Sequence, residues 1–228
     1  MLKKRIGTYL LLALFLVLLA GVFVWWRQTR VTQKTVDWDN PDYVFDIKIP
    51  DDFDQTKKDR VQLKMTEARK AYTEKKEDNY TWDIIGNLYE FVRDYDRALV
   101  VYKKSLEMQP KDVIAILNIG TIYEEQKKDY KEAEKYYSQA VVIFPQMVDV
   151  YERLANLYWH KMNKLDQTET IYIQGIEATS GKSDLMVSLI NFYGQTGQTE
   201  KQKAIAKKLL ELYPDNELYQ KDFGNLVK

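Results

Sequence analysis

The sequence predicts an all-α protein: an α-solenoid of helix-turn-helix repeats, preceded by a single transmembrane helix. Small residues and tyrosines recur every 34 or 35 residues from Trp82 onward, and a fixed period of that length is typical of stacked helical arrays. Ahead of the array, Ile6–Trp26 is a run of 21 residues without a charge. At about 1.5 Å per residue, such a run crosses a hydrocarbon core of about 30 Å as a helix.

The composition argues against several classes of function. Of the 228 residues, 34 are Lys or Arg and 34 are Asp or Glu, so the net charge gives no indication of a nucleic-acid partner. The chain has no cysteine, which excludes disulfides, thiolate catalysis and cysteine-ligated zinc.

Residues 1–5 form a short basic tail, and residues 6–26 read as a signal-anchor helix that inserts into the lipid bilayer. Trp25 and Trp26 at its end are typical interfacial residues. A cleaved signal peptide is the alternative, because a basic start and an apolar run fit that as well. A cut after Ala20 would place the bulky Leu18 at the −3 position, and the apolar run continues past it. We therefore favour the uncleaved anchor.

The orientation of the anchor is less strongly encoded. Three basic residues lie on each side of it, within about 15 residues of either end. The three on the N-terminal side are tightly clustered beside the free amine, which favours a cytoplasmic tail. We therefore expect a single-pass membrane protein whose repeat domain is extracytoplasmic.

Residues 27–56 read as a juxtamembrane linker with a short extended arm. Asn40-Pro41 favours a turn, and Tyr43–Ile49 then alternates apolar and polar residues as a β-strand does. A lone strand is not stable by itself, so the arm either docks on the protein's own first helices or pairs with a partner. Residues 57–78 read as an N-terminal capping helix or degenerate repeat, since a terminal repeat has one face in water.

The repeats share a first-helix face with a small residue and a tyrosine, a matching second-helix face, and a proline that ends the second helix. In the first repeat these positions are Trp82, Ile85, Gly86, Tyr89, Ala98, Tyr102, Ser105 and Pro110. The pattern resembles that of the tetratricopeptide repeat (TPR) family, W-x2-L-G-x2-Y, A-x3-F and P. The resemblance implies a right-handed α-solenoid with repeats at 79–112, 113–147, 148–182 and 183–216, and a C-terminal capping helix at 217–228.

Two details vary among the repeats. Tyr89 precedes Ala98 by nine residues, whereas Tyr123 precedes Ala133 by ten. We expect the extra residue in the interhelical turn, where an insertion costs little. In the fourth repeat Ile190 replaces the small residue of the other repeats.

The sequence offers little material for catalysis. His160 is the only histidine, and the chain contains no phosphate-binding loop, zinc-protease motif or nucleophile elbow. Neighbouring acids such as Glu124 and Glu125 are most simply solvated helix faces. We expect a protein that is not an enzyme, with no catalytic residue, no metal site and no cofactor.

The TPR resemblance instead implies recognition, in a concave groove lined by the first helix of each repeat. The groove residues that we carry over onto this chain are Asp83, Asn87, Phe91, Asn118, Glu125, Asp149, Arg153, Asn156, Trp159 and Asn191. Among them Phe91 and Trp159 are expected as aromatic anchors, although Trp159 could equally pack on a neighbouring helix turn.

TPR proteins that grip a C-terminal carboxylate use Lys, Asn, Asn, Lys and Arg at five groove positions. This chain keeps Asn87, Asn118 and Arg153 but has Asp83 and Asp149 where the lysines belong. Two acids in place of two lysines repel a carboxylate. We therefore expect a protein or extended peptide ligand that is neutral or basic rather than carboxylate-terminal.

The leading hypothesis is a membrane-anchored interaction scaffold. A single anchor followed by such an array resembles bacterial envelope proteins that assist secretion, folding or assembly of other proteins. One alternative is a cytoplasm-facing membrane receptor or adaptor for client proteins, and another is a non-catalytic subunit of a membrane enzyme complex. Self-association has little support, because the anchor lacks a G-x-x-x-G motif.

Overall fold

A computed structural model describes residues 36–228, and all regular secondary structure among them is helical. The chain divides into two units, Met1–Asp46 and Ile47–Lys228. The described part of the first unit contains α2 (Pro41–Val44). The second unit contains α3 (Gln55–Lys75), α4 (Asn79–Phe91), α5 (Tyr95–Met108), α6 (Val113–Thr121) continued by η1 (Ile122–Lys127), α7 (Tyr130–Ile143), α8 (Val148–Asn156) continued by η2 (Leu157–Lys161), α9 (Leu165–Ala178), α10 (Ser183–Gln195), α11 (Thr199–Leu212), α12 (Glu217–Phe223) and η3 (Gly224–Leu226).

The expected strand at 43–49 is corrected at its start, because α2 covers Tyr43 and Val44; residues 46–49 form no regular secondary structure, and no strand occurs among residues 36–228. The side chain of Asn40 accepts hydrogen bonds from the backbone N–H groups of Asp42 and Tyr43, and Pro41 occupies the first turn. An asparagine N-cap followed by proline is a strong start signal for a helix. This local signal outweighs the alternation of apolar and polar residues that suggested a strand.

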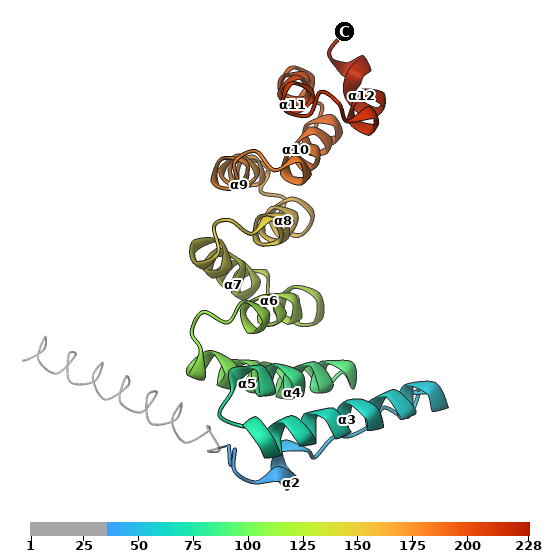
Figure 1. Cartoon of the computed structure of the whole chain (residues 1–228), viewed down its shortest axis with the longest axis vertical. Helices are drawn as coiled ribbons and strands as arrows, with labels where there is room; N and C mark the ends of the chain where they lie inside the picture. The colour runs from blue at the N-terminus through green and yellow to red at the C-terminus, as the bar shows by residue number, and fades with distance from the viewer. Residues whose placement is uncertain (1–35) are drawn as a thin grey trace, which may run out of the picture. The chain divides into compact units, whose positions relative to one another are not determined.

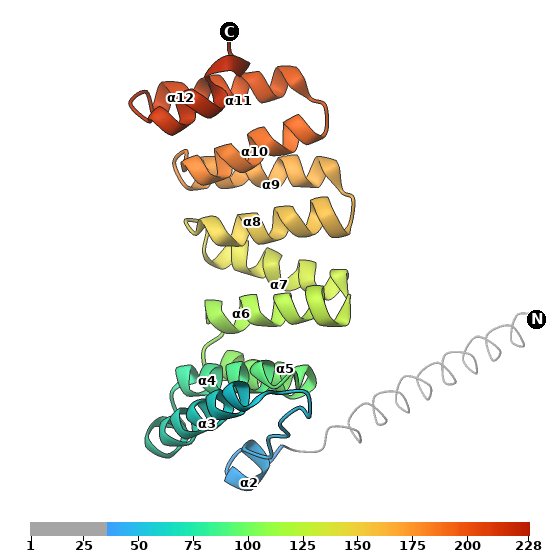
Figure 2. The same ribbon diagram turned by 90° about the vertical axis from the view of Figure 1, so that its right-hand side faces the viewer.

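Within the second unit, the helices stack in chain order from α3 to α12 (Figures 1 and 2). The first helices α6, α8 and α10 form one layer, and the second helices α7, α9 and α11 form the other. The prediction of an all-α repeat solenoid is thereby confirmed. The expected transmembrane helix at Ile6–Trp26 lies outside the described residues; from residue 36 onward, no helix is both long and apolar enough to cross a membrane.

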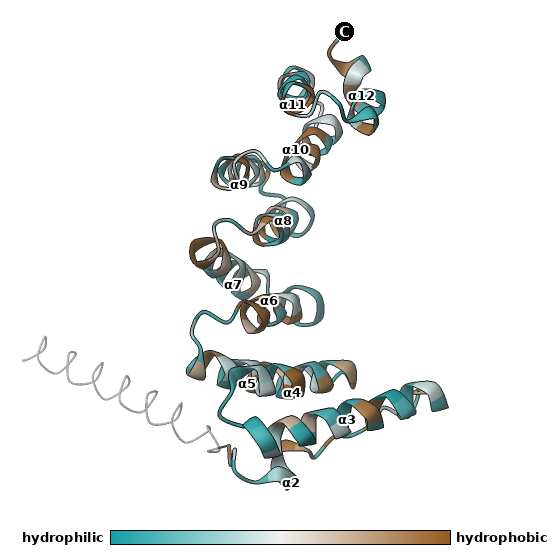
Figure 3. Cartoon of the chain, viewed as in Figure 1, coloured by the Kyte–Doolittle hydropathy of each residue, from teal (hydrophilic) through white to brown (hydrophobic). Residues whose placement is uncertain are grey.

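Most helices of the stack are amphipathic, with hydrophobic and hydrophilic residues sharing each helix (Figure 3). The repeated first-helix face is buried between the layers: Trp82, Ile85 and Tyr89 are all at most 2% exposed. At the N-terminal end, the ring of Tyr72 in α3 meets Trp82 in α4 edge to face, with centroids 6.0 Å apart. Such contacts bury the apolar stripe that each helix cannot cover alone.

The crossing of the two helices within a repeat depends on one small residue and one large partner. An added Cβ on Gly86 would lie 2.5 Å from the ring of Tyr102, and one on Gly120 would lie 2.4 Å from the ring of Tyr137. In the fourth repeat, Ile190 fills the position of these glycines, and Ala206 takes the position of the tyrosines. In the fourth repeat, the larger residue on the first helix is therefore matched by a smaller residue on the second helix.

The extra residue of the second and third repeats does not enter the interhelical turn, which corrects that expectation. It lies inside the last turn of the first helix, where η1 and η2 are π-helical. In the first repeat Asp94 N donates to Tyr89 O, whereas Asp129 N reaches back one residue further to Tyr123 O. A single inserted residue in a helix is commonly absorbed as such a π-bulge, frequently at functional sites.

Candidate functional site

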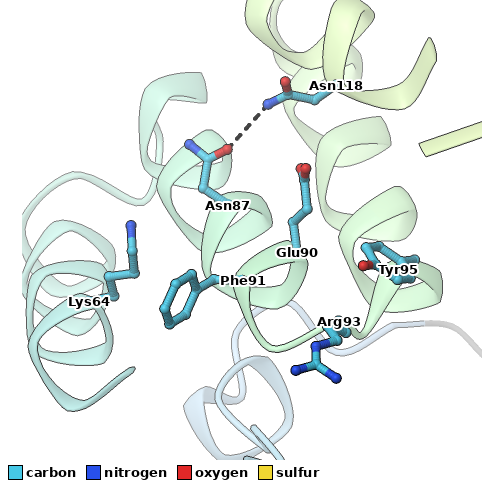
Figure 4. Close-up of a pocket in the computed structure, with 7 residues that line it drawn as sticks. All are labelled: Lys64, Asn87, Glu90, Phe91, Arg93, Tyr95 and Asn118. Atoms are coloured by element: carbon cyan, nitrogen blue, oxygen red, sulfur yellow. Dashed lines mark hydrogen bonds between the residues drawn. The ribbon is translucent and has the colours of Figure 1, made fainter. Parts of the chain in front are cut away.

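A cleft of about 500 Å³ opens at the N-terminal end of the first-helix layer. It is lined by seven residues from α3, α4, the turn after α4, α5 and α6 (Figure 4): Lys64, Asn87, Glu90, Phe91, Arg93, Tyr95 and Asn118. Three of them, Asn87, Phe91 and Asn118, are groove residues expected from the sequence. The structure therefore brings these three together around one concave surface.

A hydrogen-bond network holds the polar side of the cleft. Asn118 Nδ2 donates to Asn87 Oδ1 at 3.2 Å (Figure 4) and to the hydroxyl of Tyr102 at 2.9 Å. The Tyr102 hydroxyl in turn lies 2.6 Å from Asn87 Oδ1 and 3.0 Å from Glu90 Oε2. Burial raises the pKa of Glu90, partly offset by the hydrogen bond from Tyr102. The tyrosine that packs on Gly86 thus also fixes the neighbouring side chains of Asn87 and Glu90 on α4.

The same layer continues across the second and third repeats through side-chain contacts between neighbouring first helices. Arg153 Nη1 donates to Thr121 Oγ1 at 3.1 Å, and Arg153 Nε pairs with Asp149 at 2.9 Å. In the second repeat the Tyr137 hydroxyl donates to Glu124 at 2.9 Å. The expected groove residues Asp149 and Arg153 therefore largely neutralise each other, since they form an ion pair.

Trp159 and His160 lie on the π-helical turn that ends the first helix of the third repeat. The Trp159 ring meets Phe192 of α10 edge to face at 5.1 Å and stacks with His160 at 4.2 Å. Trp159 is half-buried and His160 is exposed. Trp159 therefore packs on a neighbouring helix, as the alternative interpretation has it, while keeping part of its ring accessible.

Asp83 differs from the expectation. It is 1% exposed, so it does not present its carboxyl on the groove surface. Its helix position faces the junction between repeats, beside Ser105 and Asp112. Burial first, and then the negative charge of Asp112, raise the pKa of Asp83 to about 7. Its Oδ1 has no hydrogen-bond partner among the described residues.

Asp112 is the charged member of this junction. Its Oδ2 accepts hydrogen bonds from Ser105 Oγ and Asn79 Nδ2, both at 2.7 Å, and its Oδ1 caps α6. Burial pushes the pKa of Asp112 up, but these hydrogen bonds outweigh it and lower the pKa. Below about pH 7, a neutral Asp83 beside an ionised Asp112 is therefore the favoured arrangement.

The remaining expected groove residues lie apart from the cleft. Asn156 and Asn191 are exposed on α8 and α10, and Asn156 Oδ1 lies 3.5 Å from the Tyr172 hydroxyl. Glu125 pairs with Lys161 at 3.3 Å and Lys128 at 3.8 Å. Among residues 36–228, no group of three or more His, Cys, Asp or Glu is placed to hold a metal ion.

Sequence reasoning missed the contribution of α3 to the cleft. Lys64 reaches the cleft from α3, and Arg60 lies one turn away, 5.4 Å from the centre of the Phe91 ring. The sequence assigned this helix to a cap, so its side chains were not carried over as groove residues. The position of α3 in the array is the signal that could have shown this. Among residues 47–228 no first helix precedes α3, so the side of α3 that faces the groove stays uncovered.

Comparison with known proteins agrees with this geometry. A sequence profile of the tetratricopeptide repeat matches residues 80–112, 114–146 and 191–216. These three segments are therefore similar to tetratricopeptide repeats. The expected third repeat, 148–182, lies between the matched segments and contributes α8 and α9 to the same stack. Among curated proteins, no relative matches the sequence.

Several solved structures are similar to this chain. The MamA RS-1 ArsTM double mutant has 16% identity and a TM-score of 0.51, over 72% of this chain and 96% of that chain. MamA 41-end from Desulfovibrio magneticus RS-1 has 16% identity and a TM-score of 0.50, over 70% and 98%. YrrB, a TPR protein with an unusual peptide-binding site, has 21% identity and a TM-score of 0.49, over 70% and 81%. At these identities the MamA structures show the fold alone.

Proposed function

We propose that this chain is a membrane-anchored protein–protein interaction scaffold, whose right-handed TPR array binds an extended peptide segment along its first-helix layer. TPR proteins are in general interaction scaffolds. The observation that carries the proposal is the cleft beside Asn87, Phe91 and Asn118, where two asparagine amides and an aromatic ring share one concave surface. Amides bond a ligand backbone irrespective of its sequence, and a partly exposed ring anchors a side chain.

The ligand of the repeats is neutral or basic rather than carboxylate-terminal. Glu152 supports this, because burial and the negative charges of Asp184 and Asp149 raise the pKa of its carboxyl. A basic ligand side chain would relieve this repulsion between like charges.

The test is photo-cross-linking from chosen positions on the full-length chain in its native membrane. A photoreactive residue at Asn191, exposed on α10, should capture a protein partner, whereas one at Lys131, exposed on α7 in the other layer, should not. Combining Trp159→Ala with Asn118→Ala should abolish the capture from Asn191. Undiminished capture in this double variant, or equal capture from Lys131, would count against binding on the first-helix layer.

The membrane half of the proposal is supported by the apolar run Ile6–Trp26 and the basic cluster before it. We place the array on the extracytoplasmic side, where it assists assembly, folding or secretion of envelope proteins. Resistance to alkaline extraction tests the anchor. Digestion of residues 27–228 by protease added to intact spheroplasts tests the orientation, and protection until lysis would place the array in the cytoplasm.

A further inference from the structure

The N-terminal end of the groove is surrounded by positive charge that the repeats themselves do not supply. Helix α3 contains seven basic and three acidic residues. Three of the basic residues, Lys57, Arg60 and Lys64, follow one face at spacings of three and four residues. Arg60 and Lys64 lie over the ring of Phe91, which lines the cleft, and Lys57 lies over the ring of Phe53.

These contacts position the cations without neutralising them. Arg60 and Lys64 lie 5.4 and 5.5 Å from the centre of the Phe91 ring, and Phe91 meets Phe53 edge to face at 5.8 Å. Among the described residues, neither Arg60 nor Lys64 forms an ion pair with an acidic side chain. A cation held over a phenyl ring keeps its full charge available to a ligand.

The cleft also presents a hydrogen-bond donor on the same side. Asn87 Oδ1 is occupied by Asn118, and the Nδ2 group of Asn87 faces the side of the cleft on which Lys64 lies (Figure 4). An amide N–H₂ beside an ammonium and a guanidinium matches a carboxylate, which accepts hydrogen bonds at both oxygens. Glu90, the acid of this cleft, is turned to Tyr102 by a hydrogen bond.

We propose that the N-terminal end of the groove binds an acidic side chain of the partner, an Asp or Glu within an extended segment, held by Arg60, Lys64 and Asn87 beside the Phe91 ring. This inference rests on the proposed function and names part of its ligand. An extended segment fits the site better than a membrane surface does, because Lys64 and Asn87 line a cleft of about 500 Å³ between helices and Arg60 lies over the Phe91 ring of that cleft. A planar array of lipid headgroups does not enter such a cleft.

As a consequence, the groove would bind its ligand in only one orientation. An acidic residue would lie over α3 and α4, while the neutral or basic part of the segment continues over the acids of α8 and α10. Charges of opposite sign at the two ends of one groove fix the orientation of a bound chain. The same peptide with its sequence reversed would place like charges together at both ends.

The experiment is selection of a random peptide library, displayed on phage, against full-length protein in detergent. Wild-type protein should enrich peptides with Asp or Glu at one position. The double variant Arg60→Glu, Lys64→Glu should lose that enrichment, and the matched control Lys58→Glu, exposed on the same helix outside the cluster, should retain it. The neutral double variant Arg60→Gln, Lys64→Met gives the same test if charge reversal impairs folding.

The selected peptides then give an affinity measurement. Reversing both charges should weaken binding of an acidic peptide about tenfold, as expected for a pair of partly exposed ionic contacts. A peptide with Gln in place of the acidic residue should bind wild-type and double-variant protein equally. Equal loss for both peptides would show that the variant damages the groove in general and would overturn the ionic contact.

The outcomes separate this inference from the proposed function. Peptides that bind through Trp159 and Asn118 without acidic enrichment would leave the proposed function standing and overturn the inference. No selected peptide at all would overturn both. If nanodiscs of phosphatidylglycerol, but not of phosphatidylcholine, protect Lys64 from chemical labelling and no acidic peptide is enriched, the cluster binds the membrane surface instead.

Discussion

The first and fourth repeats pack the same pair of helices with opposite distributions of side-chain volume. In the first repeat the first helix contributes Gly86 and the second contributes Tyr102, whereas in the fourth repeat the first helix contributes Ile190 and the second Ala206. Tyr102, Ile190 and Ala206 are all fully buried. The two repeats differ in the groove, because the hydroxyl of Tyr102 bonds the groove residues Asn87 and Glu90, whereas Ala206 has no polar group to do so.

The junction that follows each repeat shows a parallel difference. Asp83, Ser105 and Asp112 meet after the first repeat, and the corresponding positions after the fourth are Val187, Leu209 and Asn216. A buried carboxyl costs free energy that a buried leucine does not. The first repeat therefore combines a polar groove network with a costly polar junction, whereas the fourth repeat has Ala206 in place of Tyr102 and Val187 in place of Asp83.

Replacing the helix contact of the first repeat by that of the fourth should have the largest effect on the free energy of unfolding. Gly86→Ile, which places the residue of the fourth repeat in the first, should destabilise the array by about 3 kcal/mol, because the added side chain meets the Tyr102 ring. Combining it with Tyr102→Ala should cost less than the two single changes together, by about 2 kcal/mol. Urea unfolding followed by circular dichroism measures both quantities.

The matched control is Gly224→Ala, where an added Cβ meets no atom closer than 3.9 Å. Its unfolding midpoint should be unchanged or slightly higher, since alanine has the better helix propensity. Strictly additive effects of Gly86→Ile and Tyr102→Ala would show that the two residues do not share one packing contact.

The second-largest effect should be a difference in the pH dependence of stability between the Asp83 junction and the Val187 junction. The pKa of Asp83 is about 7 in the folded protein and about 3.9 when unfolded. Between these values the folded state holds the extra proton, so stability falls as the pH rises from 4 to 7. Asp83→Asn removes this loss and should stabilise the protein at pH 8 by about 2 kcal/mol, with little gain at pH 4.

Thermal unfolding of wild-type protein and of Asp83→Asn across pH 4 to 8 checks this expectation. Val187→Asn at the equivalent position of the fourth repeat is the control, and it should lower stability equally at every pH. An Asp83→Asn variant with the same pH profile as the wild type would show that Asp83 does not bind a proton in this range.

The period of the sequence was sufficient to predict the helices, because glycines, tyrosines and prolines repeat together and each has a packing or capping role. It could not show where an inserted residue goes, since a turn and a π-bulge give the same spacing between Tyr123 and Ala133. Position within the repeat also placed Asp83 in the groove, although the polar junction buries it. Lys64 was missed because its helix had been assigned to a cap, and only the structure shows which face of α3 stays open.

Removing one hydroxyl should give the smallest effect and the sharpest comparison between repeats. Tyr102→Phe should cost about 1 kcal/mol, because the groove network is partly accessible to water. The more informative readout is the NMR signals of the side-chain amides: those of Asn87 and Asn118 should shift and exchange faster, while that of Asn191 in the fourth repeat stays unchanged. Tyr172→Phe is the matched control, since its hydroxyl lies 3.5 Å from Asn156 against 2.6 Å between Tyr102 and Asn87. A larger shift at Asn156 in Tyr172→Phe than at Asn87 in Tyr102→Phe would contradict the view that the first repeat holds the ordered part of the groove.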